Sequence, residues 1–246
     1  MEGTGIVAPV TSPTFILIHG GWHGAWCWHK LVPLLEALGA RVIAPDLPSM
    51  GADSTPASAV TLESWGRFVA DIAIRAPGSV LVGHSLGGAV ISRAAQLAAA
   101  QIRQLIYLSA YLLPAGASVA SVARADAESL LAPNMIPSEP GVSCTLRPEV
   151  LREAFYGDCS DQDFDFARSR LSPQPLKPLA TRLGTSGGFE NLPRVYVETT
   201  RDRAVSISAQ RRMQAVLPCA PVFTLAADHS PFLSQPEALA RILISI

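Results

Sequence analysis

Short hydrophobic runs alternate along the chain with longer segments of helical periodicity. Six of the runs have the composition of buried strands: residues 13–20, 41–48, 79–83, 104–110, 194–199 and 221–226. Helical patterns lie at residues 25–39, 61–76, 206–217 and 235–246 and in the alanine-rich stretch that follows Gly83. Apolar strands that alternate with helices are typical of parallel sheets covered on both faces. The pattern therefore predicts an α/β fold, in which helices flank a six-stranded, mostly parallel sheet.

The alternation is interrupted between residue 113 and about residue 188. This segment is rich in proline and has no strand pattern, although residues 150–158 and 162–171 have helical ones. An insertion of this size after the fourth strand is most simply a helical cap over one end of the sheet. We therefore expect residues 1–112 and 189–246 to form the core and residues 113–188 to form the cap.

A candidate nucleophile lies where the third predicted strand meets the next helix. Gly83, His84, Ser85, Leu86 and Gly87 match the motif G-x-S-x-G, in which a sharp strand-to-helix turn exposes the serine hydroxyl above the sheet. Such a turn strains the serine backbone, and the glycines leave room for neighbouring backbone. Because the helix begins at this turn, the Leu86 N–H has no helical partner and is a candidate donor to a developing oxyanion.

A serine hydroxyl needs a base, and the base needs a carboxylate to orient it. His229 follows the last predicted strand, and Asp202 follows the strand before it. Parallel strands end at one edge of a sheet, so we expect both residues beside Ser85. The chain order Ser85, Asp202, His229 is the nucleophile–acid–base order of α/β-hydrolases. Asp228 is the competing acid, but an adjacent residue rarely reaches its neighbour's imidazole, so we expect a loop-shaping or solvated group.

A second oxyanion donor is predicted at the end of the first strand. Residues 18–22 read Ile-His-Gly-Gly-Trp and lie beside the strand that leads to Ser85. Glycine-rich loops in this place present backbone N–H groups to the site, and we assign the donor to Gly21. A plain tight turn is the alternative explanation for these glycines.

Other conspicuous residues near these motifs are interpreted as structural. Three tryptophans could line a pocket, but aromatic residues after a strand and along a first helix are more often part of the core: Trp22, Trp26 and Trp28. His23 and His29 have no cysteine or carboxylate at metal-binding spacing, so we expect core or surface histidines. His84 is expected to support the loop around Ser85, and Asp46 to make structural hydrogen bonds.

Composition narrows the classes of function. The chain has 246 residues, 49% of them hydrophobic, and its formal net charge of −1 provides no excess field for nucleic acid or anionic lipid. No stretch reaches the roughly 18 to 20 apolar residues of a membrane span, and no signal-peptide pattern is present. The four cysteines are scattered, which fits neither a disulfide framework nor a metal site. We expect a soluble, cytoplasmic protein that binds no nucleic acid, membrane or metal.

Four stretches resemble the plant methylesterase and hydroxynitrile lyase family of α/β-hydrolases, and related bacterial carboxylesterases that include pyrethroid-ester hydrolases. They are residues 15–47, 81–88, 196–214 and 228–240. The resemblance covers almost the whole chain and is weakest in the predicted cap. It implies a cofactor-free serine esterase with a small-molecule ester substrate, oxyanion donors at Gly21 and Leu86, and an aromatic pocket residue at Tyr111. Scarce lysine beside abundant arginine favours a bacterial source.

Two alternatives to an esterase stay open: a lyase or carbon–carbon-bond enzyme that uses the same triad, and a receptor-like binding protein. The hydroxynitrile lyases that the chain resembles carry a threonine at the place of Gly20 and a lysine at the place of Ser230. Without that lysine, no identifiable group balances the charge of cyanide, which favours hydrolysis. Ser85 argues against the aspartate nucleophile of dehalogenases and most epoxide hydrolases. Substrate specificity and oligomeric state stay open, with a homodimer as the candidate assembly.

Overall fold

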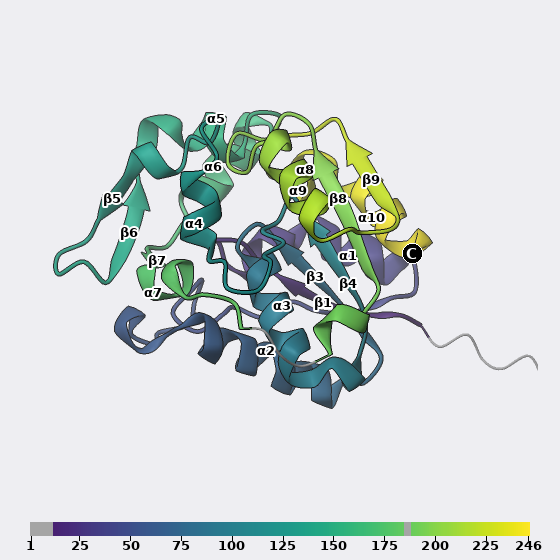
Figure 1. The fold of residues 1–246 in the computed structure, drawn as a ribbon. Coiled ribbons are helices and arrows are strands. Elements are labelled where there is room, and N and C mark those ends of the chain that lie inside the picture. Colours follow the sequence, from purple (N-terminus) through teal and green to yellow (C-terminus); the bar gives the residue numbers. More distant parts are fainter. Residues whose placement is uncertain (1–11, 185–187) are drawn as a thin grey trace, which may run out of the picture.

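The computed structural model describes residues 12–184 and 188–246, and a six-stranded sheet lies at its centre (Figure 1). The strands are β1 (Thr14–Ile18), β2 (Arg41–Ile43), β3 (Ser79–His84), β4 (Ile102–Leu108), β8 (Arg194–Thr199) and β9 (Val222–Leu225). Their order is β2-β1-β3-β4-β8-β9, and every neighbouring pair is parallel. This confirms the predicted α/β sheet and places β3, which leads to Ser85, in its interior.

Helices cover both faces of the sheet, because successive strand residues point to opposite sides. One face packs against α2 (Leu62–Arg75), α3 (Gly87–Ala98) and α8 (Ile207–Val216). The other face packs against α1 (Leu31–Ala37) and α10 (Pro236–Ser245). Neighbours along β1 show the division, since Ile16 lies in the first core and Leu17 in the second. Two apolar cores therefore hold the strand ends in place.

The helix predicted over residues 61–76 is confirmed as α2, whereas the one predicted over residues 25–39 needs a correction. Thr61 caps α2: its hydroxyl accepts a 3.1 Å hydrogen bond from the Ser64 N–H, and Ser64 Oγ accepts one of 2.9 Å from the Thr61 N–H. The single helix predicted over residues 25–39 is wrong, because a 3₁₀ helix over Ala25–His29 precedes α1. Pro33 has no N–H and is tolerated only in the first turn of an α-helix, so the α-helix begins close to it.

The insertion between β4 and β8 contains helices and also strands. Its elements are α4 (Val119–Arg124), β5 (Met135–Pro137), β6 (Ser143–Leu146), α5 (Leu151–Phe155), α6 (Asp161–Arg168), β7 (Gln174–Pro175) and α7 (Leu176–Ala180). Strands β5, β6 and β7 form a small antiparallel sheet, so the expectation of a segment without strands is wrong. These strands are too short to show an alternating pattern. Figure 1 shows the insertion at one end of the molecule, opposite α10.

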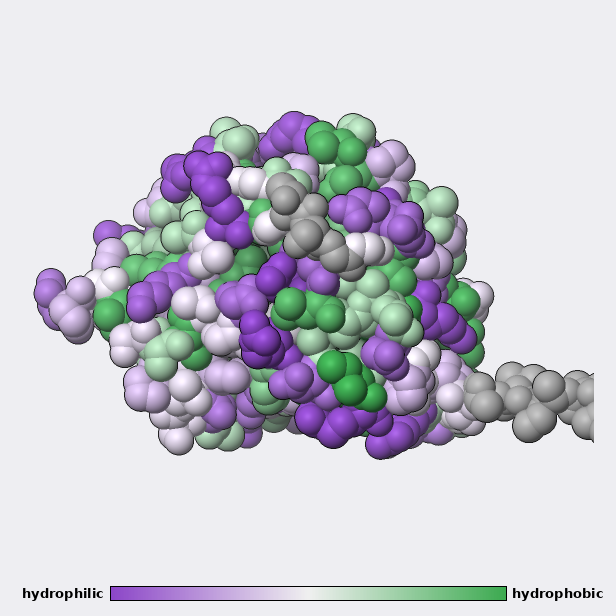
Figure 2. All heavy atoms as spheres, turned by 60° about the horizontal axis from the view of Figure 1, so that its bottom comes forward, coloured by the Kyte–Doolittle hydropathy of each residue, from purple (hydrophilic) through white to green (hydrophobic). Residues whose placement is uncertain are grey.

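We call residues 113–184 the cap. The division of the chain at residues 112/113 and 188/189 stays a prediction, and residues 1–11 and 185–187, which belong to the predicted core and cap, lie outside the described residues. Within the described ranges, no helix combines the length and the apolar character that crossing a membrane requires. Figure 2 shows hydrophobic residues in several small groups among hydrophilic ones on the face it presents.

Candidate active site

Ser85 occupies the turn between β3 and α3 in a conformation that L-residues rarely adopt. Its φ is +52°, in the left-handed region, which is costly for a residue with a side chain. Three backbone hydrogen bonds hold the turn. The Ser85 N–H donates to the Leu108 carbonyl at 3.2 Å, and the Ser85 carbonyl accepts from the N–H groups of Gly88 and Tyr111, both at 3.0 Å. The strained serine predicted from the motif is thus present.

The glycines around Ser85 are required by close backbone packing. A Cβ on Gly83 would lie 2.5 Å from the Gly87 carbonyl oxygen, and a Cβ on Gly87 would lie 2.5 Å from the Ile18 carbonyl oxygen. Backbone atoms in the sheet and helix cannot move aside as a flexible side chain can. The spacing of the motif therefore follows from the approach of α3 to the ends of β1 and β3.

Asp202 and His229 form a hydrogen-bonded pair beyond the ends of β8 and β9. Oδ2 of Asp202 accepts a 2.7 Å hydrogen bond from Nδ1 of His229. Both residues are buried, at 5% and 1% exposure. Because a carboxylate only accepts, Nδ1 carries the imidazole proton and Nε2 of the neutral ring is left unprotonated. The pair thus presents a basic nitrogen on the side of the ring away from Asp202.

His84 connects this pair to the turn that carries Ser85. Its Nε2 donates a 2.8 Å hydrogen bond to the His229 carbonyl, and the two rings lie 4.4 Å apart. The expected loop-supporting role of His84 is therefore confirmed. Among the described residues, no hydrogen bond joins Ser85 Oγ to the His229 ring, and such bonds are often long in structures without substrate.

Asp202 is held by more partners than the sequence analysis predicted. Its Oδ1 accepts from the N–H groups of Ala204 and Val205, at 2.7 and 2.8 Å. Its Oδ2 also accepts from Thr199 Oγ1 at 3.2 Å and from Gln210 Nε2 at 3.3 Å. Sequence reasoning missed Gln210, because nothing local distinguishes a glutamine of α8 from its neighbours. These bonds fix the carboxylate in the orientation that meets His229.

Asp228 is directed away from the His229 ring. Its Oδ1 accepts from Ser230 N–H at 3.1 Å and from Ser234 Oγ at 2.9 Å, and its Oδ2 accepts from the cap residue Asp158 N–H at 3.1 Å. Burial raises the pKa of this carboxyl, and its hydrogen bonds oppose that shift. Asp228 is buried rather than solvated, and it shapes the loop after β9, which is one of its two predicted roles. It also ties this loop to the cap.

Two backbone N–H groups are free at the site. Within the described residues, neither Gly21 nor Leu86 donates its N–H to a backbone or side-chain acceptor. Both residues line the same cavity as Ser85. Leu86 directly precedes α3, so its N–H lies at the positive end of the helix dipole. The arrangement can stabilise negative charge that develops beside Ser85 Oγ.

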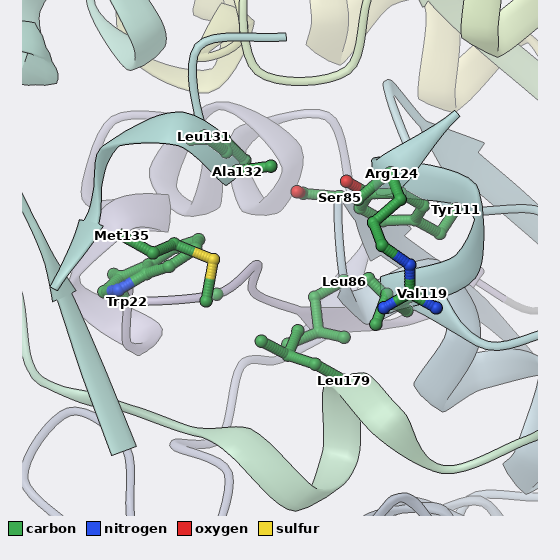
Figure 3. A pocket seen from close by; sticks show the side chains of 13 residues that line it. Trp22, Ser85, Leu86, Tyr111, Val119, Arg124, Leu131, Ala132, Met135 and Leu179 are labelled. Atoms are coloured by element: carbon green, nitrogen blue, oxygen red, sulfur yellow. The ribbon is translucent and has the colours of Figure 1, made fainter. Parts of the chain in front are cut away.

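The cavity above Ser85 has a volume of ≈ 270 Å³ and mostly apolar walls. Figure 3 shows Trp22 and Met135 on one side and Tyr111 and Arg124 on the other, with Ser85 directed toward the space between them. Tyr111 lines this cavity, and its role in binding substrate stays a prediction. Trp22 is buried in the core, as expected, and its ring also forms part of the cavity wall, which was the alternative role for it. Among the described lining residues, Arg124 alone is charged.

The remaining conspicuous residues have structural surroundings. Trp28 is fully buried in the core, and His23 is fully buried near the loop after β1. Asp46 accepts from the Ala25 N–H at 2.6 Å and from the Ala52 N–H at 3.0 Å, which confirms its structural role. All four cysteines are free thiols. Across residues 12–184 and 188–246, no three histidine, cysteine or acidic residues are grouped as metal ligands.

Comparisons with known proteins agree with this geometry. The model of a family described as "Alpha/beta hydrolase family" matches residues 15–242. The pyrethroid hydrolase of Sphingobium wenxiniae is 36% identical over 244 residues, which cover 95% of this chain and 87% of that protein. Methylesterase 17 of Arabidopsis thaliana is 31% identical, over 94% of this chain and 90% of its own. The crystal structure of a pyrethroid hydrolase from Sphingobium faniae superposes with a TM-score of 0.82 at 35% identity, covering 96% of this chain and 97% of that one.

Proposed function

The chain belongs to the alpha/beta hydrolase family, and from this premise we propose that Ser85, His229 and Asp202 are the nucleophile, base and acid of a carboxylic ester hydrolase. One observation carries the assignment of roles: the buried Asp202–His229 hydrogen bond of 2.7 Å at the sheet edge where the strained Ser85 emerges. The relatives named above are ester hydrolases, and this enzyme cleaves carboxylic esters as they do.

Acylation begins when Ser85 Oγ attacks the ester carbonyl carbon and its proton passes to Nε2 of His229. The imidazolium that forms is stabilised by the Asp202 carboxylate, which itself stays ionised. The carbonyl oxygen becomes an oxyanion and accepts hydrogen bonds from the Gly21 and Leu86 N–H groups. Because these donors have no acceptor among the described residues, no hydrogen bond to that part of the chain has to break when the charge develops.

The tetrahedral intermediate then collapses, and the ester C–O bond breaks. His229 returns its proton to the departing alcohol, which leaves the acyl group on Ser85. A water molecule next attacks the acyl carbon with His229 as base, and the second tetrahedral intermediate releases the carboxylic acid and restores Ser85. The cycle needs only the chain's own residues and water, so we propose an enzyme without a cofactor.

Esters with apolar groups fit the cavity best. Apart from Ser85, Tyr111 and Arg124, the residues that line it contribute mainly hydrocarbon or aromatic surface. Burying an apolar acyl or alcohol group against such walls is favourable by about 25 cal/mol per Å². A volume of ≈ 270 Å³ suits short to medium acyl chains.

The lyase alternative meets two obstacles at the site. A Cβ on Gly20 would lie 2.8 Å from His84 Nδ1 and 2.9 Å from Ser85 Cβ, so the threonine of the lyases does not fit here without movement of the nucleophile turn. Ser230 provides no positive charge beside His229. We therefore expect negligible cyanide release from mandelonitrile, and release faster than ester hydrolysis would overturn the esterase assignment.

Two measurements with one variant test the proposal. Wild-type protein is expected to hydrolyse p-nitrophenyl acetate and butyrate and to bind one fluorophosphonate probe per chain. Ser85→Ala is expected to lose both properties while keeping the circular dichroism spectrum and melting temperature of the wild type, because only an accessible hydroxyl is removed. Near-wild-type turnover by Ser85→Ala would remove this serine from the mechanism.

The cellular setting rests on composition and resemblance alone. We propose a bacterial source, because arginine greatly outnumbers lysine, and a cytoplasmic setting, which the four free cysteines favour. We propose a homodimer as the assembly. The binding partner that we propose is a small-molecule ester, not a nucleic acid or a membrane. Size-exclusion chromatography with light scattering measures the assembly directly.

A further inference from the structure

The Gly21 N–H belongs to the peptide group that joins Gly20 to Gly21, so its direction depends on how that group is held. The Gly20 carbonyl accepts a 2.9 Å hydrogen bond from Nδ1 of His19, and Nε2 of His19 accepts from the Leu47 N–H at 3.1 Å. A donor on the carbonyl side of a peptide also polarises its N–H. The peptide group before Gly21 is therefore held by His19, which directly follows β1.

The peptide group on the other side of Gly21 is held at both of its ends. Its carbonyl, that of Gly21, accepts a 2.7 Å hydrogen bond from Nδ1 of His23. Its N–H, that of Trp22, donates to Oε1 of Gln174 at 3.2 Å. Glycine has no side chain to restrict its φ and ψ, so the orientations of the two flanking peptide groups decide the direction of the Gly21 N–H.

His23 is in turn held by Tyr156, which lies in the cap directly after α5. The Tyr156 hydroxyl lies 2.7 Å from Nε2 of His23. Because the Gly21 carbonyl only accepts, Nδ1 carries the proton, and Nε2 of the neutral ring accepts the hydroxyl proton of Tyr156. Burial lowers the pKa of His23 to about 3, so the ring stays neutral at ordinary pH. The chain of hydrogen bonds runs in one direction, from Tyr156 through His23 to Gly21.

The cap also supplies the partners of Trp22. The Trp22 carbonyl accepts from the Ser172 N–H at 2.9 Å, and its indole N–H donates to the Cys144 carbonyl at 3.1 Å. Trp22 has a φ of +61°, which is unfavourable for a residue with a side chain. A conformation of this kind persists only where its surroundings impose it. Here the cap imposes it through three hydrogen bonds, including the one to Gln174.

We propose that His23, Tyr156 and Gln174 are positioning residues that hold the Gly21 N–H in place, and that the cap thereby completes the oxyanion hole. The cap then has a part in catalysis beyond substrate selection. The proposal rests on the proposed ester hydrolysis at Ser85. Wild-type turnover and fluorophosphonate labelling test that hydrolysis separately, so failure of one proposal is distinguishable from failure of the other.

The test compares variants that remove single members of this network. Tyr156→Phe deletes one hydroxyl, Gln174→Met deletes the acceptor of Trp22, and His23→Leu deletes the donor to Gly21. Turnover of p-nitrophenyl butyrate is measured per active site, with sites counted by the end point of fluorophosphonate labelling. A trifluoromethyl ketone, which forms an oxyanion adduct with Ser85, reports on the oxyanion hole itself.

We expect kcat per active site to fall about 10-fold in Tyr156→Phe and Gln174→Met, which is less than the 10²- to 10³-fold that loss of one donor costs. In His23→Leu we expect a fall of about 10²-fold, at the lower end of that range. KM is expected to change less than about twofold, since these residues do not contact the ground-state ester, and affinity for the ketone to fall as kcat falls. His23→Asn, whose amide can replace Nδ1 as donor, is expected to recover most of the loss in His23→Leu.

Tyr107→Phe is the matched control. Tyr107 is also a buried tyrosine with one side-chain partner, Ser92 Oγ at 2.8 Å, but it belongs to β4 and lies in the core that β4 shares with α2 and α3. It is expected to retain wild-type kcat per active site. The proposal is overturned if Tyr156→Phe and Gln174→Met match this control, if kcat falls without loss of ketone affinity, or if only the number of labelled sites falls. The proposal has Tyr156 act through His23. It is therefore also overturned if Tyr156→Phe lowers kcat by the same factor in the His23→Leu variant as in the wild type.

Discussion

The imidazole of His229 is hydrogen-bonded to Asp202, 27 positions away, and not to its immediate neighbour Asp228. The distance from Nδ1 to Asp202 Oδ2 is 2.7 Å, whereas the Asp228 oxygens accept from Ser230, Ser234 and the cap. Asp228 does not orient the ring, because the side chains of the consecutive residues Asp228 and His229 leave the backbone in different directions. Asp202 orients the ring, and Asp228 holds the loop in which that ring lies.

Asp202→Asn is expected to lower kcat for p-nitrophenyl butyrate by on the order of 10⁴, because the amide favours the wrong imidazole tautomer and leaves the imidazolium without a counter-charge. Asp228→Asn is expected to lower kcat far less, since the amide keeps one oxygen that can accept a hydrogen bond from the loop after β9. Steady-state kinetics on both purified variants measures the difference. If Asp228→Asn is the more damaging change, the acid has been assigned to the wrong residue.

Gly20→Ala is expected to reduce kcat by about 10²-fold, the cost of displacing a reacting group by about 1 Å. The added methyl group would lie 2.9 Å from Ser85 Cβ and 2.8 Å from His84 Nδ1, so the nucleophile turn has to move. Gly157→Ala is the control, because the nearest atoms to its added Cβ are 4.0 Å away. Equal activity of the two variants, measured per labelled active site, would contradict this account of the loop.

Acidification is expected to destabilise the protein through its buried histidines. Burial lowers the pKa of His23 to about 3 from the usual 6.5, and it lowers the pKa values of His19 and His84 as well. Between the unfolded and the folded pKa of such a group, the unfolded chain binds a proton that the native state does not bind. Stability is therefore full above about pH 6.5 and falls as pH decreases toward about 3.

Urea denaturation at a series of pH values measures this loss. For His23 alone, the free energy of unfolding is expected to drop by about 2 kcal/mol from about pH 7 to about pH 5. His23→Asn lacks this titrating ring, so its decrease over the same interval is expected to be smaller by about that amount. Parallel pH profiles for the two proteins would show that His23 is not held neutral in the native state.

Arg124 is expected to favour esters that carry a carboxylate at the far end of the acyl chain. No carboxylate of the described residues lies within ion-pair distance of its guanidinium, which borders an otherwise uncharged cavity. Because Arg124 is exposed, the pairing is worth at most about 1 kcal/mol, or about two- to fivefold in kcat/KM at low salt. p-Nitrophenyl hemisuccinate and p-nitrophenyl butyrate are suitable substrates to compare.

The ratio of kcat/KM values for these two esters is expected to fall in Arg124→Gln and to fall in the wild type as salt is added, because an exposed charge is screened. The rate for butyrate itself is expected to change little, since that ester has no group to pair with the guanidinium. A ratio that is the same in wild type and Arg124→Gln would exclude a role for Arg124 in choosing the substrate.

Much of the fold and the nucleophile turn could be predicted from the sequence, because they depend on patterns that are local in the chain. The alternation of apolar runs and helical segments reports which residues are buried, and so it predicted the six strands. The glycines around Ser85 indicate that backbone segments pack closely at this turn, and they lie within a few residues of one another in the sequence. The order of Ser85, Asp202 and His229 places them at one edge because parallel strands all end there.

The tertiary structure alone decided what surrounds these residues. Gln174 meets Trp22 across 152 positions, and Tyr156 meets His23 across 133, so no local pattern could indicate either contact. The same holds for the short strands of the cap. Hydrophobic periodicity states that a side chain is buried but not which partner it meets. That choice depends on how the cap packs on the core, and it sets the direction of the Gly21 N–H.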